Sequence, residues 1–451
     1  METEQKARKR HLVGFETEML ILDGNGAVST RADELIEKAA ATRLKYPVHK
    51  DYTHNMVEIS SIANVKVTKG AQGWLQTVKR LMSIAKDMGV RLYPFGTYHG
   101  THVPSPRTDR YYRMCEDIMG PTRYTFSTGH VLGFHLHYTL PYGTFNRKTS
   151  GLRQLFKSRY KEQLLNIYNA IVAIDPAVTN FMESSPFVDG VFTAKDSRLF
   201  LYRAMRTSKG EKGIKGLYYD MQIFGRLPRY NPTISDLILL IEQRYNTWKE
   251  RVEENHPEYL DIVESKHPLQ FNWGPLRINR VGTFEYRGMD MNLPSNLIGT
   301  SLLVKYFLNK VRNEELTIKP SDIGIKEPFK IEGNVMHVPP YAYLSEVLQY
   351  KSALYGLQDD EVYKYTKNFA ALAMREVPLK KDPGLRKIEW MLKARKTKSD
   401  EILQEIEKAG HSLSEKLDED FARKLALRAC DEFEEETDRL LDTELAIDFE
   451  E

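Results

Sequence analysis

Hydrophobic and polar residues alternate along several segments of the chain with the two-residue period of a β-strand. The clearest case is GFETEM, where Glu16 and Glu18 fall on one face while the odd-numbered positions fall on the other. A DGNG sequence at 23–26 predicts a tight turn after this strand. The predicted strands cover residues 12–22, 55–62, 91–97, 133–140 and 281–287.

Other segments follow the period of an α-helix. Between the second and third strands, apolar residues recur every three or four positions and would form one helix face. These residues are Trp74, Val78, Leu81, Ala85 and Met88. Longer helices are predicted at 152–174 and, after Pro232, at 234–255. From Leu344 onward the chain reads as helix, with breaks expected at Pro378, Pro383 and Gly410.

This order of elements predicts an α+β fold with one large domain over residues 1–378 and a helical extension over 379–451. Within the large domain, a mainly helical insertion is expected at about 149–269. No repeat, low-complexity block or Ser/Pro-rich linker divides the chain. The 451 residues, 41% of them hydrophobic, supply enough apolar material for a sizeable core.

Composition narrows the class of protein. No run of 18 apolar residues occurs, so no membrane contact is expected, and the N-terminal METEQKARKRH lacks the apolar stretch of a signal peptide. Two cysteines are too few for a disulfide framework and favour a reducing, cytoplasmic location. A net charge of +3 is too small for this length to indicate a nucleic-acid partner.

Charge is distributed unevenly along the chain. Residues 431–451 hold eleven acidic residues and one basic residue, as in a solvent-exposed helix with an acidic end. Residues 195–215 hold seven basic residues and two acidic ones. Within that stretch, 206–216 reads RTSKGEKGIKG, and its glycines and lysines predict a mobile loop.

Four of the predicted strands carry ionisable residues on one face and apolar residues on the other. Besides Glu16 and Glu18, these positions are Glu58, His135, His137, Glu285 and Arg287. Four carboxylates on one sheet face would repel each other strongly unless cations neutralise them. Mg²⁺ or Mn²⁺ would do so, because both prefer oxygen ligands and tolerate imidazole.

An arginine beside such ions suggests an anionic ligand, a phosphate or a carboxylate, bound by the two-pronged guanidinium. The chain has no G-x-x-x-x-G-K-[ST] or G-x-G-x-x-G loop, so a nucleotide would be bound without glycine-loop contacts. Each motif taken singly also suits an exposed strand or a surface ion pair. Their combination favours one shared metal–phosphate site.

The motifs occur in the order G-x-E-x-E, strand glutamate, H-x-H, SSP and G-T-x-E-x-R. This order resembles that of the type 2 glutamate–cysteine ligases and their carboxylate–amine ligase relatives, from about residue 11 to 290. The resemblance implies a glutamine synthetase-like fold, in which an antiparallel sheet forms a funnel with flanking helices. It also implies ATP and Mg²⁺ as cofactors, with Mn²⁺ as a substitute.

By this resemblance the metal ligands would be Glu16, Glu18, Glu58, His135 and Glu285. His137 matches the histidine nearer the ATP phosphates, and Arg287, together with Glu285, would act at the transferred phosphoryl group. The segment 180–190, NFMESSPFVDG, takes the place of the family's substrate loop. Arg198 and Arg203 after it would bind ATP phosphates or the substrate carboxylate.

The chain also departs from the family pattern. Relatives often continue H-x-H as H-x-H-x-G, whereas Thr139 stands at that position here. In FGTYHGTHVPSP, at 95–106, His99 and His102 are displaced from a G-T-H-P-like element. Both differences bear on the amine acceptor more than on the fold or the phosphoryl chemistry.

The resemblance implies an ATP-dependent ligase that activates a carboxylate, in this family that of glutamate, as an acyl phosphate and joins it to an amine. Two alternatives stay open: a small-molecule phosphotransferase on the same fold, and a non-catalytic metal or nucleotide sensor. The expected partners are an amino-acid carboxylate and an amine. Sheet edges or C-terminal helices would serve as the contact if the protein forms a homo-oligomer.

Overall fold

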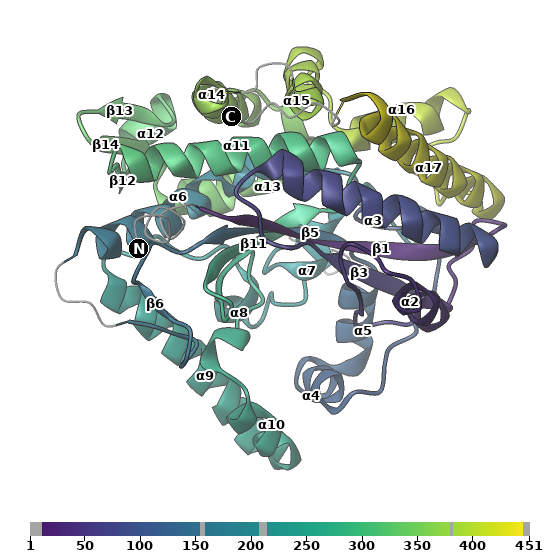
Figure 1. The fold of residues 1–451 in the computed structure, drawn as a ribbon, viewed down its shortest axis with the longest axis horizontal. Coiled ribbons are helices and arrows are strands. Elements are labelled where there is room, and N and C mark those ends of the chain that lie inside the picture. The colour runs from purple at the N-terminus through teal and green to yellow at the C-terminus, as the bar shows by residue number, and fades with distance from the viewer. Residues whose placement is uncertain (1–10, 154–157, 207–213, 379–381, 445–451) are drawn as a thin grey trace.

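A computed structural model describes residues 11–153, 158–206, 214–378 and 382–444. A twisted sheet runs through the middle of the molecule, with helices on both sides of it (Figure 1). The predicted loop at 206–216 lies outside the described residues between 207 and 213, and the acidic segment at 431–451 does so from 445 onward. None of the helices in the described ranges combines the length and apolar character that a bilayer span requires.

Within the described chain, the central sheet has seven strands in the order β10-β11-β5-β1-β3-β2, with β4 paired to the end of β1. All of its strand pairs are antiparallel, which confirms the predicted α+β class with an antiparallel sheet. The strands are β1 Val13–Asp23, β2 Val48–Lys50, β3 Met56–Ser60, β4 Val90–Tyr93, β5 Gly133–Thr139, β10 Leu276–Asn279 and β11 Thr283–Asp290.

Among the described residues, three small sheets lie outside the central one. Two are hairpin-like pairs and the third has three strands. Their strands are β6 Phe145–Asn146 with β7 Gly151–Leu152, β8 Phe187–Val188 with β9 Val191–Phe192, and β12 Thr317–Pro320 with β13 Lys330–Glu332 and β14 Val335–Val338.

Helices cover both faces of the central sheet, with α3 and α11 lying along its apolar face (Figure 1). The helices α4, α5, α8, α9 and α10 lie on the other side. The helices are α2 Ala32–Ala40, α3 Val67–Asp87, α4 Arg110–Met119, α5 Pro121–Gly129, α6 Arg159–Met182, α7 Ser197–Tyr202, α8 Gln222–Gly225, α9 Ile234–Asn255, α10 Leu260–Ser265, α11 Pro294–Asn313, α12 Asp322–Lys326, α13 Gln349–Tyr355, α14 Asp360–Glu376, α15 Pro383–Ala394, α16 Lys398–Lys408 and α17 Glu419–Arg439.

Some predicted boundaries are correct and others are wrong. Helix α9 begins and ends as predicted, and Thr233 and Asp236 form a capping box that fixes its start. Helix α6 begins at Arg159 and runs past Pro176 to Met182, beyond the predicted 152–174. Pro383 starts α15 instead of breaking a helix, as suits a residue without an amide hydrogen at the first helical position.

The C-terminal helices pack on the sheet and on α3. Trp74, on the predicted apolar face of α3, donates its Nε1–H to Thr17 Oγ1 of β1 at 2.9 Å. The Phe433 ring of α17 lies 6.3 Å from the Trp74 ring, and Arg91 of β4 pairs with Asp431 at 2.7 Å. Apolar residues on both sides of the predicted division at 378 share this core. The division itself stays a prediction.

Candidate functional site

The register of β1 places predicted site residues side by side. Glu16 lies opposite His135 of β5, and Glu18 lies opposite Glu58 of β3. Directly opposed residues of an antiparallel pair point to the same side of the sheet. These four residues therefore form one polar patch, as the alternation predicted.

Strand β11 extends the patch on the other side of β5. Glu285 lies opposite His137, and on its second side it lies opposite Arg277 of β10. The Arg277 Nε donates to Glu285 Oε2 at 2.6 Å. A β-bulge follows in β11, and such a bulge re-aims neighbouring side chains. Arg287 stands at it, with Nη1 3.5 Å from Glu285 Oε1.

Three side chains converge closely enough to bind one cation. One ligand atom from each of Glu16, His135 and Glu285 lies within 4.8 Å of the other two. His135 Nδ1 is 3.2 Å from Glu16 Oε2 and 3.8 Å from Glu285 Oε1. Glu285 Oε1 is buried and has no hydrogen-bond partner among the described residues. Two carboxylates and an imidazole with an unused oxygen fit Mg²⁺ or Mn²⁺.

The charges at this cluster favour cation binding. Burial would raise the pKa of Glu285, but Arg277 and Arg287 outweigh it and lower the pKa to about 2. Burial also opposes ionisation of Glu16, and its contacts with the two strand histidines hold its pKa well below the usual range. Burial, assisted by Arg287, lowers the pKa of His135 to about 4, so the imidazole is neutral at pH 7. A neutral imidazole is the form that binds a metal ion.

The buried carboxyl groups of Glu18 and Glu58 have too little positive charge nearby to stay ionised. Glu18 accepts the Gly133 N–H at 2.6 Å, yet burial and the nearby Asp51 raise its pKa to about 8. Burial, with Glu16 and Asp51, raises the pKa of Glu58 well above its usual range. No ion pair to Glu58 occurs in the described ranges. Cations were expected to balance every carboxylate. At Glu285, Arg277 and Arg287 already keep the carboxylate ionised. At Glu18, Arg198 and Arg287 do not outweigh burial, so a bound cation would favour the ionised form.

Arg198 of α7 lies beside this patch. Its Nη2 donates to the Arg287 carbonyl oxygen at 3.2 Å, and its buried Nε has no partner among the residues described. A Cβ on Gly133 would lie 2.6 Å from Arg198 Nη2 and 3.2 Å from Glu18 Oε2. A side chain at position 133 would have to displace the Arg198 guanidinium, so glycine allows this guanidinium and the Glu18 carboxylate to approach the strand backbone here.

Arg203 lies apart from the site. Its two terminal nitrogens donate to the Asp175 carboxylate at 2.6 and 2.9 Å, and one also donates to the Gly288 carbonyl oxygen at 3.0 Å. Both side chains of this pair are buried. The Tyr286 hydroxyl, on the apolar face of β11, donates to the same carboxylate at 2.9 Å. The placement of Arg203 does not favour nucleotide contact.

The predicted substrate loop is anchored to the end of β11. The Ser184 N–H donates to Asp290 Oδ2 at 2.9 Å, and the Ser184 hydroxyl accepts the Gly96 N–H at 2.9 Å. His99, in the segment that departs from the family pattern, lies among the rings of Tyr93, Phe95 and Phe187. Burial lowers the pKa of His99 to about 3.

The sequence pattern did not reveal Asp51 and Arg277. Arg277 belongs to LRIN, where Leu276 and Ile278 are buried and alternate with it, so this short alternation was the available signal. Asp51 stands in the connection between β2 and β3, where no periodic pattern exists. Its carboxylate accepts the Tyr52 N–H at 2.6 Å.

Comparisons with known proteins agree with this geometry. Residues 12–259 match glutamate–cysteine ligase family 2 (GCS2), a range that spans β1, β3, β5 and α7. A Corynebacterium jeikeium (strain K411) protein assigned as a glutamate–cysteine ligase 2 is 25% identical over 198 residues. That alignment covers 44% of this chain and 46% of the relative, so the chain spans about half the length of this relative.

Two solved structures share the fold. A bifunctional glutathione synthetase from Pasteurella multocida is 11% identical with a TM-score of 0.57, covering 95% of this chain and 53% of that one. A glutamate–cysteine ligase from Francisella tularensis, in complex with AMP, is 13% identical with a TM-score of 0.53, covering 96% and 92%. The family match spans more than half of the sequence and confirms the resemblance in the motifs. The chain belongs to glutamate–cysteine ligase family 2.

Proposed function

We propose that the protein is an ATP- and Mg²⁺-dependent carboxylate–amine ligase. Its substrates would be the γ-carboxylate of glutamate and an amine, with cysteine as the acceptor by analogy with the family. The family match and the assigned relative support this activity. The observation that carries it is the convergence of Glu16, His135 and Glu285 beside Arg287.

Glu16, His135 and Glu285 would hold one divalent cation. Glu18 and Glu58 would hold another, and their carboxyl groups would release protons as it binds. A bound ion of this kind offsets phosphate charge and draws electron density from the transferred phosphoryl group. The neutral imidazole of His135 and the ionised carboxylates of Glu16 and Glu285 are already in the protonation states that such binding requires.

Arg287 and Arg198 would bind the nucleotide and orient it. Arg287 forms an ion pair with Glu285 on one side, with Nη1 3.5 Å from Oε1, and its guanidinium fork would bind γ-phosphoryl oxygens. Arg198 lies next to it and would contact a further phosphate or the substrate carboxylate. His137, whose Nε2 lies 3.1 Å from Glu16 Oε1, would line the phosphate side of the patch.

The substrate carboxylate would attack the γ-phosphorus in line, forming an acyl phosphate and releasing ADP. The amine would then attack the acyl carbon, and inorganic phosphate would leave. Stabilisation of charge by Arg287 is the main contribution of the protein side chains to the first step. The sheet, with helices α4, α5 and α7 beside its polar face, would form the funnel of the glutamine synthetase-like fold. The catalytic domain would cover residues 1–378, and the protein would act in the cytoplasm.

The test is ADP release from ATP and Mg²⁺ in the presence of glutamate and a panel of amines. Glu16→Gln and Glu285→Gln should abolish the release, whereas Glu37→Gln, at an exposed position of α2, should not. Activity that survives both active-site changes would refute the site. A stable phosphorylated product without an amine would identify a phosphotransferase, and ATP binding without turnover would identify a sensor.

A further inference from the structure

A cavity of about 530 Å³ lies at α8, the segment 226–232 and the first half of α9. None of its lining residues belongs to the central sheet, so it is separate from the candidate active site. Three arginines line it, Arg226, Arg229 and Arg244. Asp236 is the acidic residue among its lining residues. The excess of guanidinium groups gives the cavity a positive charge.

The carboxylate of Asp236 is already engaged at the start of α9. It accepts the Thr233 N–H at 2.9 Å and the Thr233 hydroxyl at 2.7 Å, and it completes the capping box of the helix. Moving it toward an arginine would break that cap, which is worth about 1 kcal/mol. Among the described residues Asp236 forms no ion pair with any of the three arginines, and its single negative charge would offset only one of them.

Of the three arginines, Arg244 has the greatest need of a negatively charged partner, because only 3% of its surface is exposed. Its Nε donates to the Ile223 carbonyl oxygen at 2.8 Å. Within the part of the chain that the structure describes, no carboxylate pairs with Arg244, Arg226 or Arg229. A buried guanidinium without a counter-charge destabilises a protein unless a ligand supplies the negative charge.

Arg226 and Arg229 are held at one aromatic ring. Their guanidinium carbons lie 5.5 and 5.4 Å from the centroid of the Tyr341 ring. The Tyr341 hydroxyl donates to the Leu227 carbonyl oxygen at 2.7 Å, which fixes the ring against the same segment. Stacking on a ring leaves the in-plane N–H groups of a guanidinium available to an oxyanion.

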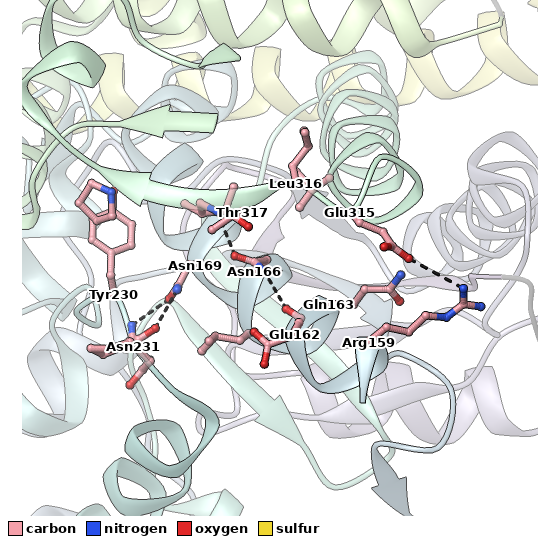
Figure 2. Close-up of a pocket in the computed structure, with 15 residues that line it drawn as sticks. Arg159, Glu162, Gln163, Asn166, Asn169, Tyr230, Asn231, Glu315, Leu316 and Thr317 are labelled. Atoms are coloured by element: carbon pink, nitrogen blue, oxygen red, sulfur yellow. Dashed lines mark hydrogen bonds and ion pairs between the residues drawn. The ribbon is translucent and has the colours of Figure 1, made fainter. Parts of the chain in front are cut away.

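A second cavity, of about 550 Å³, shares the wall formed by Tyr230, Asn231 and Pro232. Figure 2 shows that Asn231 is held by two hydrogen bonds to Asn169, both of 2.9 Å, so this wall is fixed. The second cavity has no positive excess, because it is lined by one arginine, Arg159, and two glutamates, Glu162 and Glu315, and Arg159 pairs with Glu315 at 3.9 Å. Of these two cavities, only the one at α8 and α9 has an excess of positive charge.

We propose that the cavity at α8 and α9 binds a phosphate-bearing small molecule, with its phosphate group between Arg226, Arg229 and Arg244. Three guanidiniums suit a dianionic phosphate better than a single carboxylate, because each offers a bidentate fork. The volume exceeds that of a bare phosphate, and Leu239 and Leu240 offer apolar surface to the organic part of the ligand. This site does not depend on the proposed ligase function.

The test is calorimetric titration of the full chain with inorganic phosphate, in EDTA so that no metal-dependent binding at the active site contributes. The wild type should bind phosphate saturably, and Arg226→Gln/Arg229→Gln should weaken binding about tenfold or more, as expected for lost hydrogen bonds between charged groups. The control is Arg251→Gln, on α9 but outside the cavity lining, which should bind like the wild type.

Three outcomes would overturn the proposal: no saturable phosphate binding, equal binding by the double variant, or arginine-dependent binding of acetate but not of phosphate. Circular dichroism and thermal unfolding check that the double variant is folded. If it is not, Arg229→Gln alone gives the same comparison, since this side chain is exposed and its loss spares the core.

Discussion

Replacement of Arg203 by methionine distinguishes two possible roles of this residue. The sequence suggested that Arg203 binds a ligand, whereas the structure pairs it with the buried Asp175. The change removes three hydrogen bonds, two to the Asp175 carboxylate and one to the Gly288 carbonyl oxygen. Methionine fills much of the same volume, so the main loss is electrostatic. We therefore expect Arg203→Met to destabilise the fold.

The magnitude follows from what remains around Asp175, whose side chain is fully buried. Breaking a buried ion pair by removing one partner costs about 3–5 kcal/mol. Tyr286 and Gln349 still donate to the carboxylate, at 2.9 and 3.1 Å, and they soften the loss. We expect a decrease near the lower bound, about 3 kcal/mol, a large share of the 5–15 kcal/mol that typically stabilises a domain.

Urea unfolding followed by tryptophan fluorescence measures this decrease. Arg203→Met/Asp175→Asn should recover at least about 1 kcal/mol, because the two residues are directly coupled. The matched control is Arg198→Met, which removes an arginine from the candidate site and should impair turnover with a smaller loss of stability. A stable Arg203→Met variant with a greatly raised KM for ATP would refute the reasoning and return Arg203 to the nucleotide site.

Three further predictions concern separate parts of the molecule. Arg287→Lys should lower kcat far more than ATP affinity, because lysine lacks the bidentate fork; equal losses would reassign Arg287 to nucleotide binding. Trp74→Phe should lower the free energy of unfolding by about 1–3 kcal/mol, since Thr17 loses its buried hydrogen bond and the core loses volume; an unchanged urea midpoint would contradict this. Burial lowers the pKa of His99 from 6.5 to about 3, so on acidification His99 takes up its proton at a higher pH in the unfolded chain than in the folded protein. The free energy of unfolding therefore decreases as the pH drops below 6.5. At pH 5 this amounts to roughly 2 kcal/mol, so His99→Phe should flatten the decline in stability from pH 7 to pH 5, and parallel curves for the two proteins would argue against it.

The sequence was most informative where a strict period constrained it. Period-two alternation assigns Glu16 and Glu18 to one face, and the register then places them opposite His135 and Glu58. Which strands are neighbours was not visible in the alternation, because pairing joins segments more than a hundred residues apart, as β1 with β5. The family resemblance implied an antiparallel sheet, and the order of its strands came from the structure.

The sequence predicted the structure least well where complete burial or irregular backbone leaves no periodic pattern of hydrophobic and polar residues. Helix α6 is buried on nearly all sides from Leu164 to Met182, so no amphipathic face marks its end. The predicted end at residue 174, just before Pro176, is therefore too early. Asp51 acts from a connecting segment, where only the three-dimensional fold brings it to Glu18 and Glu58. Arg203 was assigned to ligand binding because it follows a site motif, and the buried pair that it forms with Asp175 could be seen only in the fold.

The contact of α17 with α3 has a consequence for synthesis on the ribosome. Phe433 covers Trp74 and Asp431 pairs with Arg91, so a segment made near the start of translation waits for one made more than three hundred residues later. Until then the part of α3 around Trp74 and the strand β4 lack the cover of α17, a state that favours aggregation. We expect nascent chains to depend on chaperones over most of their synthesis, and products that stop before residue 419 to be insoluble.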